Sequence, residues 1–250
     1  MKRVMITGAN SGFGRALAFK LLETGNYFLI VTARDTSKLQ ALITSLPQNT
    51  RVHGVVLDVR DFESCKKAIE QIPENFRPID VLVNNAGLAL ETRPLHEGDI
   101  NDWDIMIDTN IKGVLHLTRL IAPDMVARRE GHIINIGSIA GHEVYAGGNV
   151  YCATKHAVKA LSQATRVDFL DYGIRVTEIS PGAAETNFSI TRFHGDKARA
   201  DKVYEGYAPL TAEDVAETIL FAMTRPPHVC INEIIMTCTA QFNGRIVREK

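Results

Sequence analysis

Short apolar runs alternate along this chain with longer segments in which apolar residues recur at helical spacing. The runs that have the length and composition of buried strands are Val4–Ile6, Phe28–Thr32, Val52–Leu57, Val81–Asn84, His132–Ile136, Arg175–Ile179 and Asn232–Thr237. The helical segments between them are Arg15–Thr24, Ser37–Leu46, Phe62–Ile72, Asp102–Arg128, Tyr151–Asp171 and Ala212–Thr224. This alternation predicts strands that pair in parallel through helical crossovers.

The pattern predicts an α/β fold, a Rossmann-like doubly wound parallel sheet with helices on both faces. No linker or repeat interrupts the 250 residues, so we expect residues 1–250 to form one dinucleotide-binding catalytic domain. The late segment 186–209 mixes charged and aromatic residues without a clear period. A long irregular connection of this kind predicts a mobile substrate flap.

Composition narrows the function. The chain has 28 basic and 29 acidic residues and a formal net charge of −1, which gives no general attraction for nucleic acid or an anionic membrane. No apolar run approaches the ~20 residues of a membrane span, and the start of the chain has no signal-peptide core. Cysteine and histidine spacings match neither a disulfide framework nor a metal site. We therefore expect a metal-free cytoplasmic protein without membrane or nucleic-acid partners.

The first strand-to-helix turn carries a glycine-rich segment, Thr7-Gly8-Ala9-Asn10-Ser11-Gly12-Phe13-Gly14. Gly8 permits a tight strand exit, Gly12 permits close approach of a pyrophosphate, and Gly14 permits close helix packing. The free N–H groups at the helix start then face the phosphates. The spacing Gly-x-x-x-Gly-x-Gly at this position predicts a dinucleotide site.

The end of the second strand bears on the choice of cofactor. An acid about 20 residues beyond the glycines accepts from the ribose of NAD, whereas this chain has Ala33 followed by Arg34. A guanidinium binds a 2′-phosphate through two parallel hydrogen bonds, so Arg34 favours NADP. Asp35 is the argument for NAD, unless it serves as the cap of the next helix.

Candidate catalytic groups are Tyr151 and Lys155, which lie one helical turn apart and therefore share a face. The Lys155 cation is expected to lower the pKa of Tyr151 towards working pH. Ser138 follows the fifth predicted strand, at the carboxyl end of the sheet where ligands of such folds bind. Its hydroxyl is suited to hold a substrate oxygen for Tyr151.

Together these residues make the chain resemble the short-chain dehydrogenase/reductase family over nearly its whole length. The matching segments are Thr7–Gly14, Asp58-Val59, Asn84–Gly87, Asn110, Ser138, Tyr151 with Lys155, and Pro181-Gly182 followed by Thr186. The resemblance implies a catalytic tetrad. In it Tyr151 is the general acid/base, Lys155 holds the nicotinamide ribose, Ser138 orients the substrate and Asn110 keeps a proton-relay water.

The same resemblance implies the cofactor contacts. Asp58 is expected at the adenine and Asn85 on the adenosine ribose side. The segment from Pro181 to Thr186, with Gly182 and Ala184, lies at the nicotinamide carboxamide. The expected cofactor-binding set is Thr7, Gly8, Asn10, Ser11, Gly12, Phe13, Gly14, Arg34, Asp35, Asp58, Val59, Asn85, Ala86, Gly87, Tyr151, Lys155, Pro181, Gly182, Ala184 and Thr186.

Softer motifs resemble the NADP-dependent 3-hydroxy acid (serine/allo-threonine) dehydrogenases. They are Gly137–Gly141, Gly148–Tyr151, Phe188–Gly195 and the tail Pro227–Asn232. This resemblance implies hydride transfer between NADP(H) and the 3-hydroxyl or 3-oxo carbon of a small hydroxy acid, such as serine, allo-threonine or 3-hydroxypropionate. A carbonyl reductase of other small ketones or aldehydes is the alternative.

Substrate contacts are expected from Ser138, Tyr151, Tyr145 and Arg192. The Arg192 guanidinium is suited to a substrate carboxylate, although an exposed arginine in a charged loop is an equal interpretation and Arg93 is a further candidate. Glu143 follows Ser138 closely and, if it faces the pocket, would hold an ammonium group or repel a carboxylate.

Assembly and other functions complete the expectations. The family resemblance implies a homotetramer, with apolar residues Val114, Leu117, Leu161 and Ala164 facing a second subunit. A non-catalytic dinucleotide sensor would not need an aligned Ser138, Tyr151 and Lys155. A nucleotide-sugar epimerase would need an added substrate domain, for which the residues after Thr224 leave little room.

Overall fold

The computed structural model describes residues 1–47 and 49–247. Its strands are β1 (Lys2–Ile6), β2 (Tyr27–Ala33), β3 (Val52–Val56), β4 (Val81–Asn84), β5 (Gly131–Ile136), β6 (Ile174–Pro181), β7 (Glu233–Met236), β8 (Gln241–Phe242) and β9 (Arg245–Ile246). The main helices are α1 (Gly12–Glu23), α2 (Thr36–Ser45), α3 (Phe62–Glu70), α4 (Ile100–Ile107), α5 (Gly113–Arg128), α6 (Asn149–Asp168), α7 (Phe188–Arg192), α8 (Lys197–Lys202) and α9 (Ala212–Met223).

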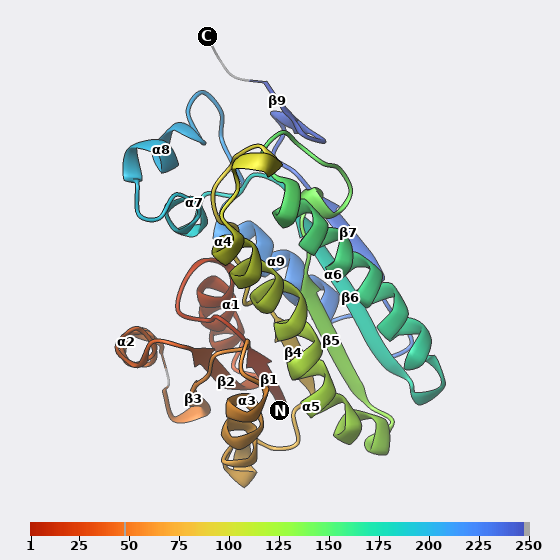
Figure 1. The fold of residues 1–250 in the computed structure, drawn as a ribbon. Coiled ribbons are helices and arrows are strands. Elements are labelled where there is room, and N and C mark those ends of the chain that lie inside the picture. The colour runs from red at the N-terminus through yellow and green to blue at the C-terminus, as the bar shows by residue number, and fades with distance from the viewer. Residues whose placement is uncertain (48, 248–250) are drawn as a thin grey trace.

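The predicted doubly wound sheet is confirmed. Seven parallel strands pair in the order β3-β2-β1-β4-β5-β6-β7, so the strand order reverses between β1 and β4. Helices cover both faces, with α4, α5 and α6 on the side nearer the viewer and α1 and α9 behind the sheet (Figure 1). In such sheets a ligand binds outside the carboxyl ends of the strands, at the point where the order reverses.

The central strands are rich in apolar residues because both of their faces are buried. In β1, Val4 and Ile6 pack with α1, α2 and α9, whereas Met5 points to the opposite core with α3 and α5. Successive side chains of a strand point to opposite faces, which gives each sheet face its own layer of aliphatic residues. The predicted strand segments therefore form the sheet, with Val52–Val56 and Glu233–Met236 at its two edges.

One predicted helix differs from expectation in its interior. The segment expected as a single helix from Asp102 to Arg128 forms α4 and α5 joined by a π-helical turn, Asp108–Lys112. A π turn widens a helix by one residue and changes which backbone carbonyls are paired. The hydrophobic period of the segment did not predict this turn.

The flap also differs from expectation, because it contains two short helices rather than irregular chain throughout. Segment 186–209 contains α7 and α8, which lie together at one end of the molecule (Figure 1). The Asp196 side chain accepts a hydrogen bond from the Arg199 backbone N–H at 3.1 Å and so caps α8.

A hairpin near the carboxyl end was missed by the sequence reading. Strands β8 and β9 pair antiparallel through Asn243 and Gly244, and Asn243 has a φ of +55°. Asn-Gly between two short runs is a strong hairpin signal that could have located it. No helix in the described part of the chain has the length and apolar character needed to cross a bilayer.

Candidate active site

The glycine-rich turn joins β1 to α1 and is held in shape by Thr7 and Asn85. The buried Thr7 hydroxyl accepts from the backbone N–H groups of Asn85 and Ala86, at 3.0 and 2.9 Å. The Asn85 side-chain amide donates to the carbonyls of Thr7 and Gly8, at 2.8 and 3.1 Å. The Asn85 amide therefore shapes the turn, while Asn85 also lines the cavity on whose adenosine ribose side the family resemblance places it.

Two glycines in the turn have conformations or neighbours that exclude a side chain. Gly12 has a φ of +52°, in the left-handed region that other residues rarely adopt. A Cβ on Gly14 would lie 2.6 Å from the Asn85 amide nitrogen and 3.0 Å from the Gly8 carbonyl oxygen. Helix α1 starts at Gly12, and Ser11 is its N-cap residue with an extended backbone. This start is three residues before the predicted start at Arg15.

Strand β2, next to β1 in the sheet, ends on Ala33 as expected, and the Arg34 that follows it is exposed. The Asp35 carboxylate accepts from the Lys38 backbone N–H at 2.9 Å, so it caps α2. Asp35 serves as the cap of α2, and Arg34 beside it is free to face the cavity. The main argument for NAD, and so against a 2′-phosphate at this position, is thereby removed. Lys38, which also lines the groove, was not found from the sequence.

Asp58 is paired with a neighbour that the sequence reading overlooked. Arg60 Nε and Nη2 donate to its carboxylate, with Nη2 at 2.6 Å from Oδ2. The hydrogen bond from Arg60 holds the pKa of the Asp58 carboxyl below its usual range. The carboxylate expected at the adenine is therefore part of an ion pair.

Tyr151 and Lys155 lie on one face of α6 and are both buried, at 8% and 6% exposed. The Lys155 ammonium donates to the Ile136 carbonyl, the last of β5, at 2.8 Å. The same ammonium lies 5.9 Å from the centroid of the Tyr151 ring. The predicted shared face is thus observed.

The electrostatics of Tyr151 correct one expectation. Burial raises the pKa of the Tyr151 phenol above its ordinary value. The charge of the Arg192 guanidinium and a hydrogen bond with Ser138 oppose this rise. Burial also lowers the pKa of Lys155 to about 8. The rise caused by burial outweighs the groups that oppose it, so the expected lowering of the phenol pKa is not observed.

Ser138 follows β5 at the carboxyl edge of the sheet. Its hydroxyl accepts from the Ala140 N–H at 3.1 Å and caps a short 3₁₀ turn, Ile139–Gly141. The turn fixes the hydroxyl at the floor of the same cavity that Tyr151 and Lys155 line.

Asn110 lies within the π turn and is almost fully buried, at 1% exposed. Its side-chain oxygen accepts from the Leu88 N–H at 2.9 Å, and its amide donates to the Leu88 carbonyl and the Thr154 hydroxyl at 2.8 and 3.0 Å. Asn110 thus ties the segment after β4 to α6, one residue before Lys155. Its side chain does not line the cavity.

The segment after β6 forms the wall opposite α6. Pro181 ends the strand, and the Ala183 N–H donates to the Gln241 side-chain oxygen at 2.7 Å. The Thr186 hydroxyl accepts from the Phe188 N–H at 3.2 Å at the start of α7. Gln241 comes from the hairpin missed by the sequence reading.

Arg192 and Tyr145 meet at the substrate end. Arg192 Nη2 donates to the Tyr145 hydroxyl at 3.1 Å, and its Nε is buried without a hydrogen-bond partner among the described residues. Phe188 packs against the Tyr151 ring with a centroid distance of 5.7 Å. Arg93, the alternative cation, is 55% exposed at its side chain and pairs with Glu91. Arg192 is therefore inside the cavity, which argues against the exposed-loop interpretation.

Glu143 has a structural contact. Its carboxylate accepts from the Gly244 backbone N–H at 3.0 Å, so it ties the β8–β9 hairpin to the segment after Ser138. This contact accounts for the carboxylate without a substrate ammonium.

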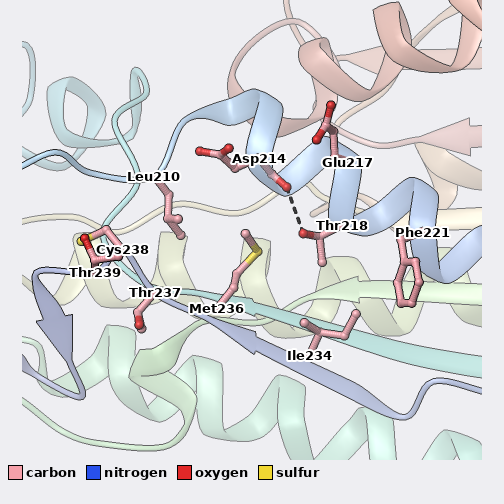
Figure 2. A pocket seen from close by; sticks show the side chains of 10 residues that line it. All are labelled: Leu210, Asp214, Glu217, Thr218, Phe221, Ile234, Met236, Thr237, Cys238 and Thr239. Atoms are coloured by element: carbon pink, nitrogen blue, oxygen red, sulfur yellow. Dashed lines mark hydrogen bonds between the residues drawn. The ribbon is translucent and has the colours of Figure 1, made fainter.

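These walls enclose a cavity of about 770 Å³. It is lined by all the predicted cofactor and substrate residues except Thr7 and Gly14, which lie behind the glycine turn. A second hollow of about 700 Å³ lies between α9 and β7, lined by residues such as Phe221, Ile234 and Met236 (Figure 2). None of the predicted site residues is among its lining, and it contains no comparable arrangement of polar groups.

The fold and this cavity define a dinucleotide-binding α/β protein, and comparisons identify its family. The short chain dehydrogenase family matches residues 2–197. A protein of Schizosaccharomyces pombe named NADP-dependent 3-hydroxy acid dehydrogenase is 44% identical over 251 residues, covering 100% of this chain and 97% of the relative. The sulfoacetaldehyde reductase 2 of Chromohalobacter salexigens is 44% identical over 239 residues, covering 95% and 94%. The chain belongs to the short chain dehydrogenase family.

Among solved structures, the closed form of serine dehydrogenase complexed with NADP⁺ is similar to this chain throughout. The two are 41% identical with a TM-score of 0.93, and the match covers 99% of each chain. The family expected from the sequence is thereby confirmed, together with the dehydrogenase class of its chemistry.

The tetramer residues need a correction. Val114 and Leu117 are 7% and 0% exposed within the chain itself, and Leu117 belongs to the core with α3. Outward apolar residues of these helices include Leu115 on α5 and Val167 on α6, at 46% and 75% exposed. The expectation is therefore wrong for the two α5 residues, whereas on α6 Leu161 is half-buried and Ala164 is exposed, as a subunit contact would need.

Proposed function

We propose that this protein is an oxidoreductase that transfers a hydride between NADP(H) and the 3-hydroxyl or 3-oxo carbon of a small hydroxy acid, such as serine, allo-threonine or 3-hydroxypropionate. The observation that carries the proposal is the Arg192 guanidinium, which lies in the same cavity as Tyr151 and Ser138, 5.3 Å from the Tyr151 ring. A cation fixed beside the acid/base selects a substrate that has an anion close to its reacting carbon.

The cofactor is NADP(H), and the groove fits it. Ala33 leaves no acid at the strand end to repel a 2′-phosphate, and the exposed Arg34 offers a guanidinium next to it. Gly12 lets the backbone approach the pyrophosphate at the start of α1. When bound, the nicotinamide supplies or accepts the hydride. The relatives whose names or titles mention NADP support this choice.

Tyr151 serves as the general acid/base, since its phenol is buried in the cavity and adjoins the hydroxyl of Ser138. In reduction it donates its proton to the substrate oxygen, and in oxidation it takes the proton of the alcohol. Ser138 orients that oxygen, and Lys155 provides a cation within the same site. The Asn110 amide donates to the Thr154 hydroxyl and so holds the π turn against α6, behind both groups. The relay water expected at Asn110 stays a prediction, because the side-chain amide is already paired with Leu88 and Thr154.

The substrate anion would bind at Arg192, whose Nε is buried with no partner among the described residues. Tyr145 fixes the other side of the guanidinium through its hydroxyl. A carboxylate accepts the two N–H groups that a guanidinium presents in parallel, and this pairing would satisfy the unpaired Nε. The similarity to a 3-hydroxy acid dehydrogenase and to a serine 3-dehydrogenase supports this substrate class.

A second candidate is reduction of a small sulfonated aldehyde. The guanidinium that fits a carboxylate also fits a sulfonate, and a relative at 44% identity is named sulfoacetaldehyde reductase 2. Both candidate reactions place the substrate anion at Arg192 and use the same mechanism. They differ in whether that anion is a carboxylate or a larger sulfonate.

An initial-rate screen tests the proposal. L- and D-serine, the threonine isomers, 3-hydroxypropionate and 3-hydroxyisobutyrate are assayed with NADP and NAD, beside sulfoacetaldehyde with NADPH and a neutral alcohol series. We expect NADP-dependent turnover of anionic substrates, with neutral alcohols far slower. Near-normal turnover by Tyr151→Phe would overturn the mechanism. Activity confined to neutral ketones or aldehydes would overturn the substrate class and favour the general carbonyl reductase.

We further propose a homotetrameric assembly and a cytoplasmic location. The exposed Leu115 and Val167 offer apolar surface on the outer helices, and the cysteines Cys65, Cys152, Cys230 and Cys238 are all free, as suits a reducing compartment. Sedimentation of the protein at several concentrations tests the assembly, since a species of one subunit mass throughout would contradict it.

A further inference from the structure

Strand β6 carries a glutamate in the middle of the sheet. Every residue of Ile174–Pro181 is buried, and Glu178 is only 2% exposed. A carboxylate in such a place is unfavourable unless an opposite charge or hydrogen bonds compensate it. The proposed mechanism gives this residue no role.

The Glu178 carboxylate lies next to the backbone that holds the catalytic lysine. A Cβ added to Gly137 would contact Glu178 Oε1 and would lie 2.6 Å from the Ser180 hydroxyl oxygen. Gly137 follows Ile136, whose carbonyl accepts from the Lys155 ammonium at 2.8 Å. The buried acid and the buried cation thus pack against consecutive residues at the end of β5.

Further polar groups connect Glu178 to the surface. The Ser180 hydroxyl donates to Glu178 Oε1 at 2.9 Å and lies 3.4 Å from His142 Nε2. His142 Nε2 is 2.8 Å from Glu233 Oε1 on β7, and its Nδ1 is 2.8 Å from the ammonium of Lys159 on α6. Lys155 and Lys159 lie one turn apart on α6, and the charges of both act on Glu178.

We propose that Glu178 is the buried counter-charge of Lys155, a positioning residue that keeps the ammonium protonated and so supports the acid–base function of Tyr151. This inference rests on the proposed function, in which Lys155 provides the cation of the site. The groups facing Glu178 are Lys155 and Lys159 from α6, Glu233 from β7 and, through Ser180, His142 after the 3₁₀ turn.

The electrostatic balance supports the pairing. Burial lowers the pKa of Lys155, and Glu178 is the charge that raises it again. Burial and the Glu233 carboxylate raise the pKa of Glu178, whereas Ser180, Lys155 and Lys159 lower it. Each member of the pair thus favours the charged form of the other.

The same cluster brings one His142 nitrogen and carboxylate oxygens of Glu178 and Glu233 within 4.8 Å of one another, a spacing that would also suit a cation. The Lys159 ammonium, at 2.8 Å from His142, already supplies positive charge there. We therefore interpret the cluster as a charge network and not as a metal site.

Glu178→Gln tests the proposal, because the amide keeps the size of the side chain and removes its charge. The primary readout is the titration of Lys155 in protein labelled with ¹³Cε-lysine, assigned with Lys155→Met. We expect the pKa of Lys155 to fall by about 1 unit or more, the range for loss of a close opposite charge. The second readout is the pH profile of kcat/KM for reduction, whose alkaline limb should move to lower pH with the lysine.

Glu233→Gln is the matched control, since it removes a carboxylate of the same cluster that is 29% exposed at its side chain. Removing this repulsive charge favours ionised Glu178, so the alkaline limb should stay in place or move to higher pH. Ser180→Ala should give a smaller shift in the direction of Glu178→Gln, because the carboxylate loses its donor. This variant keeps the proposal testable if Glu178→Gln does not fold.

An unchanged Lys155 titration in both Glu178→Gln and Ser180→Ala would overturn the counter-charge, even if stability fell. That result would leave the proposed function intact, because Tyr151→Phe tests the function separately. Conversely, a shifted lysine titration in an enzyme that tolerates Tyr151→Phe would keep the ion pair and remove the catalytic assignment.

Discussion

The guanidinium of Arg192 lies 5.3 Å from the centroid of the Tyr151 ring and 5.0 Å from that of Phe188. A residue of the flap therefore lies over the proposed acid/base on α6, although the two are 41 positions apart in the sequence. Because the flap brings this cation, the shape of the flap affects both the binding of an anion and the charge around the phenol.

Arg192→Ala should raise KM for hydroxy acids by about 10- to 100-fold, the cost of losing a charge-assisted pair. Neutral alcohols should lose far less, since they make no use of the guanidinium. Arg192→Lys, which keeps the charge without the planar fork, should fall between the two. Equal losses on acids and neutral alcohols would remove the carboxylate clamp.

Arg34→Ser should reduce kcat/KM for NADP by about 10-fold or more and leave NAD nearly unchanged, because only NADP carries the 2′-phosphate. Ala33→Asp should shift the preference further towards NAD by placing an acid at the end of β2. Lys38→Ala is the control for a general loss of positive charge at the groove. A loss of equal size with both cofactors in Arg34→Ser would contradict the assignment.

The flap is tied to the segment after β4 by Glu91. Its carboxylate accepts from Arg199 Nη1 and Nη2 at 3.1 and 3.0 Å, and its backbone N–H donates to the Arg192 carbonyl at 2.8 Å. Glu91→Gln and Arg199→Ala should therefore loosen α8, raise KM several-fold and speed limited proteolysis within residues 193–206. Lys197→Ala, an exposed change on the same helix, serves as the control. Cleavage at the rate of the unaltered protein in both variants would show that this pair does not hold the flap.

His132 predicts a pH dependence of stability. Burial lowers its pKa from 6.5 to about 3, and its Nε2 lies 2.8 Å from the Thr177 hydroxyl in the sheet. The folded protein therefore keeps this ring neutral between pH 6.5 and about 3, where the unfolded chain binds a proton. The free energy of unfolding should fall as pH falls through this window, by up to about 1.4 kcal/mol per pH unit from this group.

Urea unfolding at pH 5.0 to 7.0 measures that slope, and His132→Gln provides the comparison because it cannot take up the proton. The variant should be less stable at pH 7 but should lose less stability on acidification. Parallel curves for the two proteins would show that other groups account for the pH dependence.

The sequence could predict the strands because their burial is local information. A strand covered on both faces must be apolar throughout, as in Val4–Ile6 and Val81–Asn84, and each such run became a strand of the sheet. The π turn at Asp108–Lys112 could not be predicted in this way, because it changes the backbone hydrogen bonds of the helix and not the burial of a whole segment.

The candidate site was predictable where it depends on the backbone. Gly12, Ser138 and Tyr151 stand at fixed places relative to strand and helix ends, and those places meet at one edge of a parallel sheet. Residues contributed by distant segments could not be placed in this way. Gln241 and Glu178 enter the site or its surroundings through contacts that no spacing in the chain records.

By itself, the order of amino acids determined the doubly wound fold, the family and the residues around the dinucleotide, because these follow from periodicity and from short motifs at element ends. Only the tertiary structure decided how the charges are paired: Asp58 with Arg60, Glu143 with the hairpin, and Arg192 over Tyr151. The physical reason is that the pKa of a group depends on its burial and on its neighbours in space, and both are set when distant segments pack together.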